Sequence, residues 1–209
     1  MSSERAYIVD TVVVLYFLLV DQAALLRRLL GEPLRVPIAV FDPEERSLPP
    51  EALRHSEFLS EMRQAVRYYE VAARSDPAAA QQLERLLRLD SMYDLGQLEI
   101  VALTDEERTL AAHLQSRRVV AEHAIKAPLG AGEAACVAIA FKRGWIPVTD
   151  DSAALTVLAE LLGRDYPYER IRRLLLRSIE EGLLSTDEAA RIHAEMRQVG
   201  FWDRADLLA

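Results

Sequence analysis

Acidic residues stand at the ends of three segments whose sequences predict regular structure. Asp10 follows a short apolar run, and Glu133 opens an alanine-rich stretch that predicts a helix. Asp150 and Asp151 follow the apolar run at residues 145–149, which predicts a strand. Because an α/β protein binds its ligands beyond the carboxyl ends of its parallel strands, these acids are expected to converge there.

Converging carboxylates favour metal chemistry. Two of them at about 4 Å repel by roughly 4 kcal/mol in a near-surface dielectric, and a hard divalent cation turns that cost into binding energy. We therefore expect a Mg²⁺ or Mn²⁺ site that hydrolyses a phosphodiester. Each acid also has a structural interpretation. Asp10 suits a helix N-cap or a buried partner to an arginine, Glu133 suits a first helical turn, and one of Asp150 and Asp151 suits the cap of the next helix.

The order of predicted elements indicates an α/β fold with a mainly parallel sheet, because strands alternate with helical segments. The predicted strands cover residues 6–14, 34–41, 98–103 and 145–149. The predicted helices cover residues 15–30, 105–114, 116–125, 132–143 and 153–162, with a capping box at Thr104. Prolines between residues 43 and 50 indicate a loop.

Two further regions are predicted to be helical. Residues 51–94 form two amphipathic pieces separated by Asp76 and Pro77, within a helical insertion of about residues 43–95. The tail of about residues 168–209 is arginine-rich and helical. The insertion carries many apolar residues, among them Phe58 and Leu86, so we expect it to pack against a second copy of the chain or a partner. Leu86→Glu should then convert a homodimer or a heterocomplex to monomers without unfolding the α/β domain.

The composition is that of a globular protein. The 209 residues are 51% hydrophobic and 28% charged, and we expect one domain spanning residues 1–209. The apolar run at residues 12–20 is shorter than the roughly 20 residues of a spanning helix, so no membrane role is expected. The lone cysteine, Cys136, fits the reducing cytoplasm. The net charge of −8 implies that nucleic acid is held by a local patch or only briefly.

Three motifs together resemble the PIN-domain family, closest to the branch in which Gly-Glu opens the catalytic helix. They are Ile8-Val-Asp10-Thr11, Gly130-Ala-Gly132-Glu133 within residues 129–140, and Pro147-Val-Thr-Asp150-Asp151 within residues 147–154. The resemblance covers the first strand and about residues 97–202. It implies a three-layer α/β/α fold and a Mg²⁺- or Mn²⁺-dependent endoribonuclease. Asp10, Glu133, Asp150 and Asp151 would be its metal-site acids, and the resemblance also implies the toxin of a toxin–antitoxin pair, with an antitoxin protein as partner.

The chain departs from the family pattern after its second strand. The family often has another acid there, in a Val-x-x-Glu pattern, whereas Val40 is followed here by Phe, Asp42 and Pro. Asp42 is the nearest substitute, and Glu44 or Glu45 is the next. The family also often has an arginine where this chain has Leu155.

Two other functions compete with an endoribonuclease that cleaves single-stranded or structured RNA. A non-catalytic PIN-like module with a vestigial metal site would bind protein or RNA, and the acidic charge and the displaced acid favour it. A structure-specific DNase would use the same ligands. Five arginines of the tail region form either a basic edge that guides RNA or a solvated helix face laced with glutamates: Arg164, Arg170, Arg172, Arg173 and Arg177.

Overall fold

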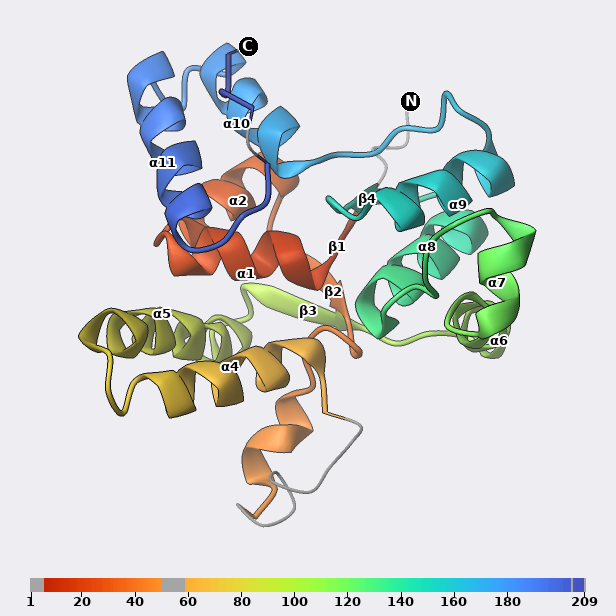
Figure 1. Ribbon diagram of the computed structural model, residues 1–209, viewed down its shortest axis with the longest axis horizontal. Coiled ribbons are helices and arrows are strands. Elements are labelled where there is room, and N and C mark those ends of the chain that lie inside the picture. Colours follow the sequence, from red (N-terminus) through yellow and green to blue (C-terminus); the bar gives the residue numbers. More distant parts are fainter. Residues whose placement is uncertain (1–5, 50–58, 204, 209) are drawn as a thin grey trace.

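The strands are short, and all of them pair in parallel. A computed structural model of the chain describes residues 6–49, 59–203 and 205–208. Its strands are β1 (Tyr7–Val9), β2 (Leu34–Pro37), β3 (Leu98–Val101) and β4 (Ile146–Val148). β1 pairs with β4 and β2 pairs with β3, and β1 also lies next to β2. The predicted α/β fold with a parallel sheet is therefore confirmed (Figure 1).

Helices surround this small sheet and make up most of the described chain (Figure 1). They are α1 (Thr11–Leu19), α2 (Ala23–Leu30), the 3₁₀ helix η1 (Pro43–Ser47), α4 (Glu61–Ala72), α5 (Pro77–Asp94), α6 (Asp105–Leu114), α7 (Arg117–Glu122), α8 (Ala131–Arg143), α9 (Ser152–Leu162), α10 (Ile171–Glu180) and α11 (Thr186–Gln198). None of the helices in the described ranges is long and apolar enough to cross a membrane.

The first strand is shorter than its sequence predicts. Residues 12–14 are valines, which favour strands, but they belong to α1, which begins at Thr11 because Asp10 caps it. The carboxylate of Asp10 accepts a hydrogen bond from the backbone N–H of Thr11, and this cap places the acid at the junction of β1 and α1.

The helices α4 and α5 pack on the rest of the chain through their apolar faces. Met62, Val66, Leu86 and Met92 belong to the same buried cluster as residues of β1 and α1. Leu86 is only 1% exposed, so the prediction that Leu86 lies at an intermolecular interface is wrong. Phe58, the other apolar residue singled out in this region, lies outside the described residues.

The C-terminal segment returns to the core after α11, alongside α10 (Figure 1). Phe201 is 4% exposed and its ring meets Tyr16 of α1 edge-on, with 5.1 Å between ring centroids. The next residue, Trp202, is 56% exposed. The chain thus buries one aromatic ring and presents the other at the surface.

Candidate metal site

Three carboxylates from separate elements meet at the carboxyl end of β1. Asp10 follows β1, Glu61 is the first residue of α4, and Glu133 lies in the first turn of α8. One oxygen of each lies within 4.8 Å of one oxygen of each of the others. The sequence pattern predicts that Asp10 and Glu133 lie together, as they do, and it gives no sign of Glu61.

The side chain of Asp10 is held in position by hydrogen bonds from the protein itself. Its side chain is fully buried. One oxygen accepts from the Thr11 N–H at 2.7 Å, and the other accepts from the Thr149 hydroxyl at 2.8 Å. Thr149 follows β4, the strand paired with β1, so the sheet itself sets the position of this carboxylate.

Glu61 reaches the site because the chain returns to the end of β2. The N–H of Glu61 donates to the carbonyl of Ala39 at 3.0 Å, and that of Met62 donates to Val40 at 3.0 Å. The Glu61 carboxylate accepts from the Thr11 hydroxyl and, at 3.0 Å, from the N–H of Gly132. Glu61, about twenty positions after Val40, therefore lies beside Asp10 and Glu133, whereas the acid expected near this point of the chain was Asp42.

Glu45 secures the start of α4. Its two carboxylate oxygens accept from the N–H and the hydroxyl of Ser60, each at 2.6 Å. Because Ser60 immediately precedes Glu61, the buried Glu45 acts as a positioning residue for the third carboxylate.

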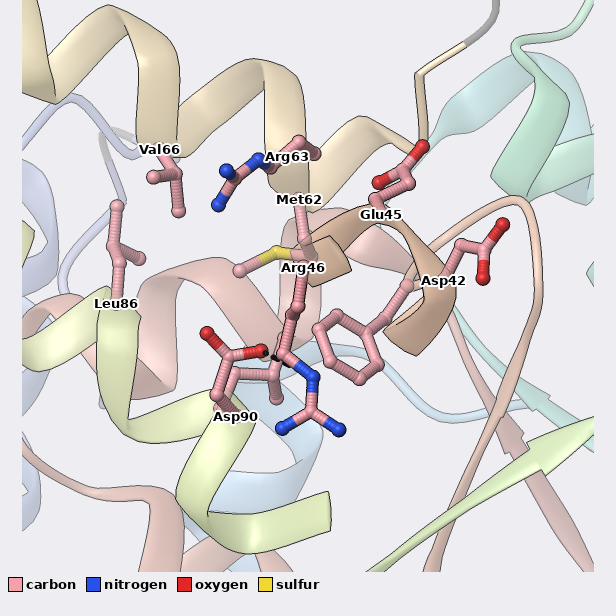
Figure 2. A pocket seen from close by; sticks show the side chains of 10 residues that line it. Asp42, Glu45, Arg46, Met62, Arg63, Val66, Leu86 and Asp90 are labelled. Atoms are coloured by element: carbon pink, nitrogen blue, oxygen red, sulfur yellow. Dashed lines mark ion pairs between the residues drawn. The ribbon is translucent and has the colours of Figure 1, made fainter. Parts of the chain in front are cut away.

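The neighbouring contact between η1, α4 and α5 is a packing seam. Figure 2 shows Arg46 reaching from η1 to Asp90 of α5, 3.7 Å away, while the side chains of Asp42 and Glu45 point away from Asp90. The space enclosed there is about 20 Å³, room for about one water. Asp42 caps η1 by accepting from the N–H of Glu44 at 2.9 Å, and it is outside the group of three carboxylates.

The two adjacent aspartates after β4 face different parts of the fold. Both oxygens of Asp150 are engaged: one accepts from Arg170 at 3.0 Å and the other from the N–H of Ile171 at 2.8 Å. This carboxylate holds the beginning of α10 and is not among the three that meet. Asp151 caps α9 through the N–H of Ala154, and its charge acts on Glu133.

Two observations fit a bound cation. Oε2 of Glu133 is buried and has no hydrogen-bond partner among the described residues. Gly132 leaves open the space between the acids: a Cβ there would lie 2.5 Å from Oε2 of Glu61 and 3.0 Å from Oδ1 of Asp10. The donors are all hard oxygens, which suit Mg²⁺ or Mn²⁺.

The electrostatics of the metal-free site are unfavourable to three ionised acids. Burial, followed by the charges of Glu133 and Glu61, raises the pKa of Asp10 well above its ordinary value. Burial and then the charges of Glu61 and Asp151 raise the pKa of Glu133 to about 7. A cation competes with these protons, so its binding strengthens as the pH rises through neutrality.

Searches against known protein families, curated proteins and solved structures find no match for this chain. The assignment of the site therefore rests on its geometry and on the motifs of the sequence.

The raised pKa of Glu133 leads to a testable pH dependence. In the unfolded chain Glu133 loses its proton at about pH 4.3, the ordinary value for a glutamate. In the folded chain it keeps that proton up to about pH 7, so between these two values the folded state binds more protons than the unfolded state. The free energy of unfolding of the metal-free protein should therefore fall as the pH rises through that window. Urea unfolding in EDTA at pH 5.5 and pH 7.5 measures the change. Glu133→Gln should show a smaller decline, and an identical decline in both proteins would contradict the pKa assignment.

Proposed function

We propose that the chain is a metal-dependent endoribonuclease of the PIN type, with the three-layer α/β/α arrangement of that family. The observation that carries the proposal is the meeting of Asp10, Glu61 and Glu133 around an oxygen of Glu133 that lacks a hydrogen-bond partner. A fold gains nothing by burying such a group alone. A cation that is coordinated by all three carboxylates would give this oxygen of Glu133 a partner.

Each of these acids has a defined task. Asp10, Glu61 and Glu133 would hold Mg²⁺ or Mn²⁺, and Asp151 adds negative charge beside Glu133. A cation held there supplies Lewis-acid stabilisation of the scissile phosphate and lowers the pKa of an attacking water. Thr149 and Thr11 keep Asp10 and Glu61 in place by donating to them. Gly132 donates its N–H to Glu61 and keeps the space between the acids open.

The substrate and the partners belong to the same proposal. RNA is the substrate we favour, and the carboxylates by themselves suit a DNA backbone equally well. We further propose that the chain is the toxin of a toxin–antitoxin pair, that an antitoxin protein binds it, and that it forms a homodimer. The net charge of −8 favours the second candidate, a PIN-like binding module with a vestigial metal site, because an acidic surface weakens contact with nucleic acid.

Cleavage of RNA separates the two candidates. The wild type should cleave single-stranded or structured RNA with Mn²⁺ and not in EDTA. Asp10→Asn and Glu133→Gln keep the side-chain shapes and remove charge, so each should abolish cleavage. Glu106→Gln serves as the control, since Glu106 is an exposed partner of Lys142. Equal cleavage by the wild type and by either site variant would overturn the catalytic assignment.

A further inference from the structure

A pocket rich in arginine opens beside the start of α10. It has a volume of about 320 Å³, and Arg170, Arg172, Arg173, Trp202, Asp150 and Asp203 contribute to its lining. Three arginines and two aspartates line it, in a protein whose net charge is −8. The pocket is a local basic site of the kind that an acidic protein needs in order to hold a polyanion.

Trp202 is held in place although it is exposed. The guanidinium of Arg170 lies over its ring, 5.5 Å from the centroid, and the ring of Phe201 is 5.8 Å away. Since Phe201 is buried against Tyr16, the backbone beside the indole is anchored. An anchored, solvent-facing indole is a ready stacking surface for a planar ring.

The side chain of Arg173 is exposed, and only a weak ion pair holds it. Arg173 pairs with Glu180 at 3.3 Å, and both side chains are more than half exposed. A pair of this kind contributes little free energy, so Arg173 can leave it for a phosphate. Arg170 and Arg172 are already engaged with Asp150 and with the carbonyl of Leu207, and they shape the pocket.

The pocket adjoins the three carboxylates along the chain. Thr149 donates to Asp10, the next residue lines the pocket, and Asp151 acts on Glu133. These three consecutive residues join the two sites without an intervening element. The pocket and the three carboxylates are therefore connected through the residues that follow β4.

We propose that this pocket binds one nucleotide of a single-stranded nucleic acid. The indole of Trp202 stacks on the base and Arg173 contacts the phosphate. The inference rests on the proposed nuclease function and names the form of its substrate. A single strand is required because a base inside a duplex is already stacked and cannot reach the indole.

Fluorescence of Trp202 tests the stacking directly. The chain has two tryptophans, so Trp145→Phe leaves Trp202 as the only indole. This variant is titrated in EDTA, where the proposed nuclease is silent, with single-stranded RNA, single-stranded DNA of the same sequence, duplex RNA and inorganic tripolyphosphate. We expect the single-stranded RNA to quench the fluorescence, duplex RNA to do so much less, and tripolyphosphate not at all. Quenching by the DNA strand as well would assign the pocket to either backbone.

Anisotropy of a labelled strand gives the energetic test. Stacking on an aromatic side chain contributes about 1–3 kcal/mol per base, so Trp202→Ala should bind roughly 5- to 10-fold more weakly, since the indole is only partly enclosed. Trp202→Phe should recover most of the affinity. Arg173→Gln should reduce the slope of log affinity against log salt by about 0.7, the value for one phosphate contact on a single strand.

The outcomes separate the pocket from the catalytic claim. Unchanged affinity of Trp202→Ala with no quenching, or equal quenching by duplex RNA, would overturn the nucleotide pocket whatever the cleavage assay shows. Quenching with no Mn²⁺-dependent cleavage by the wild type would keep the pocket and remove the nuclease function.

Discussion

Glu61→Gln should lower Mn²⁺-dependent RNA cleavage by more than about 100-fold, a loss of at least ~2.7 kcal/mol of transition-state stabilisation. The variant keeps an oxygen that accepts from the N–H of Gly132 and removes a negative charge from the cation site. Asp42→Asn is the matched control. Asp42 was the acid expected to complete the site after the second strand, and the structure places it at the cap of η1.

The comparison of these two variants tests the structure rather than the family pattern. Initial rates at saturating Mn²⁺ measure it, with circular dichroism to show that both variants fold. Normal rates for Glu61→Gln together with a large loss for Asp42→Asn would restore Asp42 to the site and contradict the position of α4.

Mn²⁺ should raise the melting temperature of the wild type and have much less effect on two variants of the site. A cation bound only by the folded chain adds about 2.7 kcal/mol at a hundredfold excess over its Kd. For a chain of this size the corresponding shift is roughly 5–10 °C. Asp10→Asn loses a ligand. Gly132→Ala loses none, but its methyl group would meet Oε2 of Glu61 at 2.5 Å and force that carboxylate away.

Gly132→Ala carries its own internal control. Its melting temperature in EDTA measures the cost of the clash by itself, because the new Cβ would also lie 2.9 Å from Oγ1 of Thr11, and the Mn²⁺ shift is measured from that value. A full Mn²⁺ shift in both variants would mean that the ion binds elsewhere.

Local signals in the sequence predicted local structure well. The capping box at Thr104 and the cap formed by Asp76 before Pro77 both appear in the structure, because each depends on residues within a few positions of one another. The start of α1 was misplaced because the valines at residues 12–14 favour strands, whereas capping by Asp10 and burial against the core decide their conformation.

The group of three carboxylates was predicted only in part, because the position of Glu61 depends on pairing between distant parts of the chain. Asp10 and Glu133 stand next to recognisable strand and helix starts. Glu61 is brought in by hydrogen bonds from α4 to Ala39 and Val40, across an excursion of about twenty residues. No local pattern shows where such an excursion ends. Asp150 lies outside the group for a similar reason, because residues about twenty positions away decide where its carboxylate points. Arg170 and the N–H of Ile171, at the start of α10, donate to it.

Crystals of the wild type soaked in Mn²⁺ give the most direct test of the metal site. Anomalous scattering locates manganese independently of the protein atoms. The account predicts an ordered ion within about 2.5 Å of oxygens of Asp10, Glu61 and Glu133, and no ion in crystals of Asp10→Asn. An ion held instead by Asp150 or Asp42, or the absence of any ion between the three carboxylates at saturating Mn²⁺, would contradict it.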